Sequence, residues 1–269
     1  MLEQADLSRE LRKEEYAESM PPLRDKLYGL QMACRAARVP SIIVIEGWAG
    51  ADKRGVVRTL TRRLDPRYYK LHPIESPRSI ELEMPRLWRF WLRLPAYGEM
   101  AIFYRSWYRR LIADRIEGIV APDDWERRCR DIEDFERALA ADGGVIVKFF
   151  LHISRKSQEK HFKRLQKDPL MSLHVDPADE LQHEKYDEHL RVIEQTLART
   201  ETEWGPWTII EATDSRWAKY RVFATLVERL EERLRQRGIE PPEVARGAAA
   251  AHLGEERVPS GDRLDEQDL

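Results

Sequence analysis

The chain has 269 residues, a length that suits a single domain with one substantial hydrophobic core. Its 46 Lys and Arg residues nearly balance 48 Asp and Glu residues, so the net charge of −2 gives no overall bias towards nucleic acid or an anionic membrane. Two cysteines, Cys34 and Cys129, exclude a disulfide scaffold. We find neither a signal peptide nor an apolar run of membrane-spanning length, and therefore expect a cytoplasmic protein with no membrane partner.

Alternating helices and strands are predicted along most of the chain. Residues 7–37 carry a helical apolar stripe, and Pro21-Pro22 predicts a kink or break between two helices. The β-branched run at 41–47 is typical of a strand buried on both faces of a parallel sheet. Further strands are expected at 68–72, 100–104, 144–153 and 207–212, and helices at 53–64, 83–94, 106–119, 124–140, 157–167, 179–200 and 217–237. This order implies an α/β fold with a doubly wound, mostly parallel sheet.

The same pattern suggests three parts. Residues 1–40 form an N-terminal helical extension, residues 41–237 form the sheet domain, and residues 238–269 form a tail of Pro, Gly, Ala and charged residues without periodicity. Such a composition favours a disordered tail.

The first predicted strand runs into a glycine-containing loop, with Lys53 at the start of the next helix. A phosphate loop lies at this place in P-loop proteins, because backbone N–H groups and the positive helix end face an anion there. The G-x-x-x-x-G-K-[ST] pattern fails at two positions: Asp52 replaces the second glycine, and Arg54 replaces the Ser or Thr that would hold magnesium. An ordinary strand-to-helix turn therefore remains an equal alternative.

Basic residues follow this loop in unusual number. Arg54, Arg58 and Arg62 share one helical face, and seven of the eight charges between Lys53 and Lys70 are positive. We interpret Arg54 and Arg58 as phosphate-binding, and the alternative is a solvated helix face.

A second set of basic residues follows the strand at 100–104. Arg105, Ser106 and Arg109 come at its carboxyl end, where α/β proteins bind ligands and where arginine can contact phosphate with two N–H groups. P-loop kinases usually carry a magnesium-binding aspartate at this strand end, and this chain has Tyr104. A phenol does not replace that carboxylate at neutral pH. The seven histidines form no metal-binding pattern.

Together these residues resemble the polyphosphate kinase type 2 family over roughly residues 5 to 235. Motifs in family order carry the resemblance: EGW and the loop with Lys53, LDPR at 64–67, LWRFWLRLP at 87–95, IFYRSWYRR at 102–110, VIVKFFLHIS at 145–154, FK at 162–163, DPL at 168–170, GPW at 205–207 and DSRW at 214–217. The resemblance implies a P-loop kinase-like fold with a helical lid at about 155–185, and Mg2+ as cofactor. It also implies phosphoryl transfer between inorganic polyphosphate and nucleoside mono- or diphosphates, in dimers or tetramers.

Several functional positions of the family carry other residues here. The two magnesium-binding aspartates fall on Ala49 and Tyr104, and most lid cations fall on uncharged or weakly basic residues (His161, Leu165, Met171, Ser172, Leu173 and His174). The positions retained imply a catalytic set of Lys53, Asp52, Arg105 and Asp114 and a phosphate-binding set of Lys53, Arg54, Arg58, Arg105, Ser106 and Arg109. Asp52 is the candidate magnesium ligand.

Three functional hypotheses follow. We favour a catalytically impaired copy that retains polyphosphate binding. The second hypothesis is an active polyphosphate:AMP or ADP phosphotransferase with a rearranged metal site. The third is a non-catalytic partner that assembles with further copies or with an active paralogue through exposed helices at 87–94 and 217–235. None of them involves nucleic acid.

Overall fold

A five-stranded parallel sheet forms the centre of the computed structural model, which describes residues 1–165 and 177–243. The strands stand in the order β2-β3-β1-β4-β5 and have these bounds: β1 Ser41–Gly47, β2 Tyr69–Pro73, β3 Met100–Tyr104, β4 Val145–His152 and β5 Trp207–Glu211. The apolar β1 and β4 are central and almost wholly buried, as expected of strands covered on both faces. The predicted α/β fold with a parallel sheet is confirmed.

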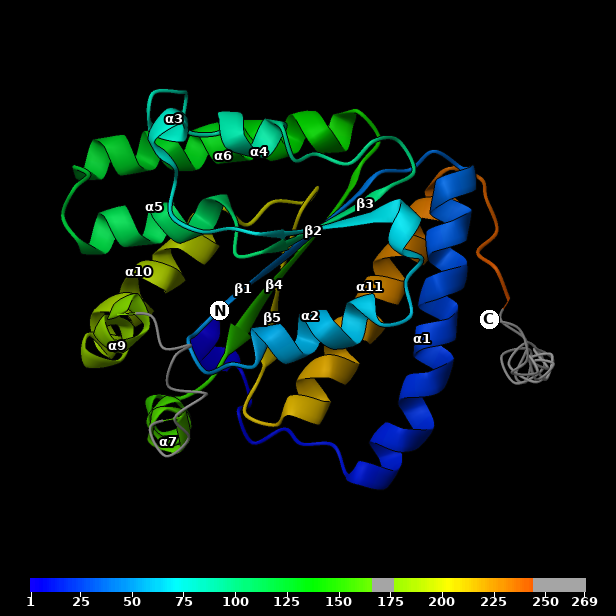
Figure 1. The fold of residues 1–269 in the computed structure, drawn as a ribbon, viewed down its shortest axis with the longest axis horizontal. Coiled ribbons are helices and arrows are strands. Elements are labelled where there is room, and N and C mark those ends of the chain that lie inside the picture. The colour runs from blue at the N-terminus through cyan, green and yellow to red at the C-terminus, as the bar shows by residue number, and fades with distance from the viewer. Residues whose placement is uncertain (166–176, 244–269) are drawn as a thin grey trace, which may run out of the picture.

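Helices cover both faces of the sheet (Figure 1). One face carries α1 (Lys13–Ala36), α2 (Lys53–Thr61) and α11 (Ser215–Gln236). The other carries α5 (Trp107–Ile116), α6 (Pro122–Ala141) and α10 (Tyr186–Arg199), together with the short α3 (Ser79–Leu82) and α4 (Trp88–Trp91). Two more helices, α7 (Arg155–Leu165) and α9 (Pro177–Glu184), lie beyond the carboxyl end of β4, and single 3-10 turns occupy Leu2–Gln4 and Pro66–Tyr68.

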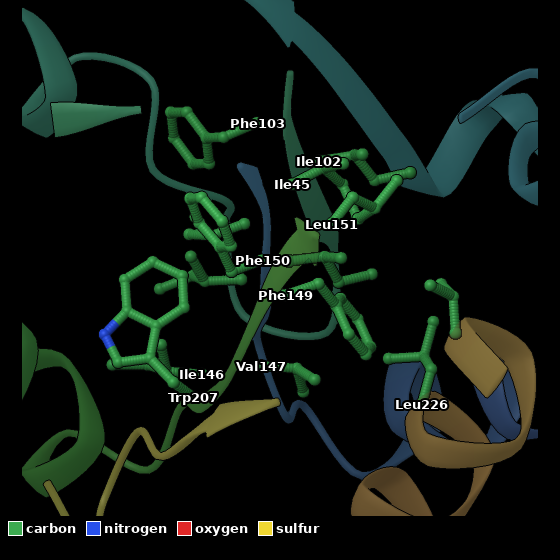
Figure 2. Close-up of a cluster of buried hydrophobic side chains, with 14 of the residues drawn as sticks. Ile45, Ile102, Phe103, Ile146, Val147, Phe149, Phe150, Leu151, Trp207 and Leu226 are labelled. Atoms are coloured by element: carbon green, nitrogen blue, oxygen red, sulfur yellow. The ribbon is translucent and has the colours of Figure 1, made fainter. Parts of the chain in front are cut away.

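Side chains of the strands fill a core on each face of the sheet (Figure 2). Successive residues of β4 point to opposite faces, so that Phe150 lies on the side of Phe103 and Phe149 on the side of Leu226 of α11. Both faces belong to one continuous cluster of buried residues. The sheet and its loops are therefore held as one unit, which fixes the strand ends that form the site.

The N-terminal helix differs from its prediction. A single helix, α1, runs through Pro21 and Pro22 without the expected break. Met20, Leu27 and Leu30 are buried on either side of the prolines, and α1 packs against α11. Burying these three side chains contributes about 4.5–9 kcal/mol in total, which is enough to offset the roughly 6 kcal/mol that two prolines cost inside a helix.

Other segments also differ from the sequence prediction. The prediction of a helix at 83–94 is wrong. Only the four-residue helices α3 and α4 form, one on each side of Pro85, because proline lacks the N–H donor that a continuous helix needs. The expected helix at 179–200 is divided at Lys185 into α9 and α10. The helix at 217–235 is not an exposed surface, since α11 buries eight residues against the sheet and α1.

Two predicted segments lie partly outside the described residues. Positions 166–176 of the expected lid and positions 244–269 of the expected tail lie outside the described residues. Within the two described ranges, no helix combines the length and apolarity needed to cross a membrane.

Candidate phosphate-binding site

The site begins where the carboxyl ends of β1 and β3 meet. Ile45 of β1 pairs with Tyr104 of β3, and the Arg105 N–H donates to the Ile45 carbonyl at 3.0 Å. The loop leaves β1 at Gly47, whose φ of +141° disfavours other residues. A Cβ at Gly47 would also lie 2.4 Å from the Leu151 carbonyl oxygen of β4. Glycine therefore allows the loop to pass close to the central strand.

Lys53 is buried at the N-terminus of α2. Its ammonium donates to the carbonyl oxygens of Gly47 at 2.7 Å and Trp48 at 2.6 Å. Burial, together with the positive charge of Arg105, lowers the pKa of Lys53 to about 8. The lysine therefore holds the loop closed while remaining mostly charged at neutral pH.

A cleft of about 580 Å3 opens in front of this loop. Among the described residues, its lining includes five basic ones, namely Lys53, Arg54, Arg105, Arg109 and Arg164, and three acidic ones, namely Asp52, Glu75 and Asp179. This local excess of positive charge, in a protein with a net charge of −2, is of the kind that attracts anions. Four of the predicted phosphate-binding residues are thus brought together here, whereas Arg58 lies exposed on α2 and does not line the cleft.

Asp52 adopts the left-handed conformation, with φ of 53°, that suits the glycine of a phosphate loop. Its carboxylate accepts hydrogen bonds from the Gly55 N–H at 3.1 Å and from the Ser215 hydroxyl at 2.5 Å, and forms an ion pair with Lys219 at 3.1 Å. Burial raises the pKa of Asp52, but Ser215 and Lys219 outweigh this effect and hold the pKa below its ordinary value. The carboxylate therefore caps α2 and ties the loop to α11.

Ser106 is directed into the protein. Its hydroxyl donates to the Glu46 carboxyl at 2.7 Å and accepts the Tyr108 N–H at 3.3 Å, so that it caps α5. Burial raises the pKa of Glu46 above its ordinary value, although Ser106 and Lys53 act in the opposite direction. Glu46 was missed by sequence reasoning, although an acid at the end of an otherwise apolar strand is a signal that could have found it.

Asp114 lies on the far side of α5 from the loop. It is buried and forms ion pairs with Arg110 at 3.3 Å and with Arg128 of α6. It lines an adjoining cavity of about 500 Å3 next to α3 and α4, which shares Glu75 and Arg109 with the cleft, and does not line the cleft itself. Asp114 therefore makes no contact with the loop at Lys53, and its catalytic role stays a prediction.

The side chains at the family's magnesium positions do not fit that ion. The Ala49 side chain has no ligand atom, and Tyr104 offers a phenol in place of a carboxylate. Asp52 is engaged by Gly55, Ser215 and Lys219, and a cation would have to displace the ammonium. Among the residues that the structure describes, no three His, Cys, Asp or Glu side chains gather as a metal site.

Three residues of α7 and α9, Gln158, Asp179 and Gln182, complete the site; they were not predicted, although both helices lie within the expected lid range. Asp179 of α9 pairs with Arg105 at 3.1 Å, and Gln182 of α9 accepts the Ala49 N–H at 2.7 Å. Gln158 of α7 donates to the Ala49 carbonyl at 3.2 Å. A glutamine or aspartate on a charged helix gives no local signal for such contacts, so only the docking of these helices reveals them.

The class of protein follows from this arrangement. A buried strand leads through a loop to a lysine at a helix N-terminus, at the carboxyl edge of a parallel sheet, as in P-loop proteins of the kinase type. The family model of polyphosphate kinase 2 matches residues 10–238. The chain belongs to the polyphosphate kinase 2 family.

Individual relatives agree with this assignment. A polyphosphate:AMP phosphotransferase from Pseudomonas aeruginosa is 37% identical over 231 residues, which are 86% of this chain and 47% of that protein. An ADP-polyphosphate phosphotransferase from Rhizobium meliloti is 29% identical, over 83% of this chain and 74% of the relative. A polyphosphate kinase 2 crystal structure from P. aeruginosa superposes with a TM-score of 0.83 at 36% identity, over 87% of this chain and 50% of the other. The chain thus spans about half the length of the two P. aeruginosa proteins.

Proposed function

We propose that this domain binds inorganic polyphosphate in the cleft at Lys53 and that its own phosphoryl transfer is strongly reduced. One combined observation carries the proposal: the cleft has five basic side chains, and the two magnesium positions are occupied by Ala49 and Tyr104. The first feature supports binding of a polyanion, and the second removes the groups that position the metal.

Magnitudes support this separation of binding from chemistry. Phosphoryl transfer depends on positioning and on neutralisation of charge by metal and cations. The loss of one preorganised electrostatic group costs on the order of 10²–10³ in rate, so the loss of two would reduce transfer by roughly 10⁴ or more. Binding depends instead on the summed charge of the cleft, which the two substitutions do not reduce.

We also propose that a nucleoside mono- or diphosphate is the second ligand, since the relatives are named for AMP and ADP. The buried free thiols Cys34 and Cys129 support function in a reducing cytoplasm.

A second candidate function is that of a non-catalytic partner. Trp91 and Leu92 lie side by side at the end of α4 and expose 50% and 64% of their surface, so that they offer an apolar contact. This exposed apolar pair supports assembly with a second copy of the chain or with an active paralogue. Mass measurement in solution, with Trp91→Lys as the disrupting variant, tests this candidate.

The Lys53→Met variant tests polyphosphate binding at this cleft. We expect long-chain polyphosphate to bind the wild-type protein with an affinity that falls as salt rises, and to bind Lys53→Met at least tenfold more weakly. Titration calorimetry at two salt concentrations measures both effects.

The exposed Lys13 of α1, which does not line the cleft, provides the matched control as Lys13→Met. Equal loss in the two variants would mean that binding is diffuse, and the proposed site would be wrong. Thermal unfolding of each variant establishes that the loop substitution leaves the fold intact.

A further inference from the structure

Asp179 places a carboxylate against a residue that is expected to bind phosphate. Its Oδ1 lies 3.1 Å from a terminal nitrogen of Arg105, and both side chains are largely shielded, with 23% and 19% of their surface exposed. The same carboxylate also stabilises the charged form of Lys53, where it acts against the burial that lowers that pKa. Asp179 therefore lies in the positive field of the loop and not on an open helix surface.

A second oxygen from α9 lies on the loop itself. The Gln182 side-chain oxygen accepts the Ala49 N–H at 2.7 Å, and the Gln158 amide donates to that same oxygen at 3.2 Å. Backbone N–H groups of a phosphate loop are the groups that bind an anion. Thus α9, which lies beside α7 beyond the carboxyl ends of the strands (Figure 1), supplies an oxygen both to the loop backbone and to Arg105.

We propose that Asp179 is an internal competitor of polyphosphate: its carboxylate occupies the position of a phosphate at Arg105, and a bound polyanion must displace it. This inference rests on the proposed function, because it concerns the same cleft. The carboxylate and a phosphate group both use the planar guanidinium, which offers its N–H donors in a fixed fork. The contact is an autoinhibitory one, since the affinity for the polyanion is reduced by the stability of the ion pair.

The test compares the affinity for inorganic tripolyphosphate of the wild type, Asp179→Asn and Glu180→Gln. Glu180 is the next residue of α9, is exposed, and its substitution removes the same charge. We expect Asp179→Asn to bind about two- to fivefold more tightly than the wild type, the factor that a partly shielded ion pair accounts for. Glu180→Gln is expected to change the affinity less than twofold.

A double-mutant cycle separates competition at Arg105 from a general effect of charge. In the Arg105→Gln background, Asp179→Asn is expected to give no further gain, because the contact that it relieves is already absent. An equal gain in both backgrounds, or no gain in either, would overturn the inference while leaving the proposed function intact. Absence of binding in every variant would overturn the proposed function and the inference together. Asp179→Ser repeats the measurement if the Asn variant fails to fold.

Discussion

Asp52 shows how one side chain changes what a phosphate loop can do. Its backbone has φ of 53°, in the region where a residue other than glycine costs about 1–2 kcal/mol. Its carboxylate offsets part of this cost by capping α2, a contact typically worth about 1 kcal/mol. N–H groups at the start of a helix are also those that bind an anion, so under the proposed function the cap would compete with a bound phosphate.

Replacement of Asp52 tests this interpretation. Asp52→Asn keeps a capping oxygen and tolerates the left-handed backbone, but removes the negative charge. We expect stability to change by less than about 1 kcal/mol and tripolyphosphate to bind several-fold more tightly, because two unit charges 4 Å apart repel by about 4 kcal/mol at an effective dielectric near 20 and the Lys219 charge screens part of this. Calorimetric titration measures the change. Weaker binding, or loss of a magnesium-dependent activity, would indicate that Asp52 holds the metal.

His152 at the end of β4 makes stability depend on pH. The Trp48 indole N–H donates to its Nδ1 at 2.9 Å, so this buried ring is neutral, and burial lowers its pKa to about 4. A pKa below that of the unfolded chain, about 6.5, means that the folded state binds fewer protons. The stabilisation that the neutral His152 gives the folded state is therefore fully present above about pH 6.5 and is lost as the pH falls towards 4.

We therefore expect the unfolding free energy of the wild type to fall between pH 7 and pH 5 by about 2 kcal/mol more than that of His152→Gln. The glutamine amide oxygen can still accept the Trp48 hydrogen bond, but does not titrate. Urea unfolding at the two pH values measures both slopes. Parallel slopes would show that His152 is not held neutral.

At the scale of elements, a buried ion pair joins helix α6 to the sheet. Lys148 of β4 and Glu136 of α6 are both fully buried, 2.8 Å apart. The ammonium also donates to the Tyr108 hydroxyl at 3.0 Å and to the Thr200 carbonyl at 2.9 Å. Its three partners come from α5, α6 and the end of α10, so one lysine holds three helices against the sheet.

Glu136→Gln should destabilise the fold by about 3 kcal/mol or more, because it leaves the buried ammonium without its counter-charge. The matched control is Asp134→Asn on the same helix, whose pair with Arg137 is exposed and should be worth less than about 1 kcal/mol. Chemical denaturation provides both values. Similar small losses would mean that Lys148 is stabilised mainly by its neutral partners.

Elements whose signal is local were predicted best from the sequence. The strand at 100–104 was predicted with its observed bounds, and β1 was predicted likewise, because short apolar runs are typical of buried parallel strands. Tertiary packing decided the rest. Burial of Leu27 and Leu30 carries α1 through two prolines, whereas the aromatic run at 83–94 forms only short turns over α6 and the core.

At the scale of the whole molecule, the sequence predicted which residues meet at the site, but not the direction of every side chain. Lys53, Arg54, Arg105 and Arg109 converge because carboxyl ends of parallel strands meet at one edge of the sheet. Side-chain direction is not given by that rule, so Ser106 turns inward to Glu46 and Asp114 turns to Arg110 and Arg128. The contacts of α9 depend on how segments more than 70 residues apart dock, which spacing along the chain does not reveal.

The most direct test of the account is transfer of phosphate from long-chain polyphosphate to AMP, ADP and GDP with magnesium, measured beside polyphosphate binding on one preparation. We expect binding without turnover, since Ala49 and Tyr104 remove the carboxylates that position the metal while the five basic residues of the cleft remain. Robust magnesium-dependent turnover would contradict the account and would mean that other groups have rebuilt the metal site.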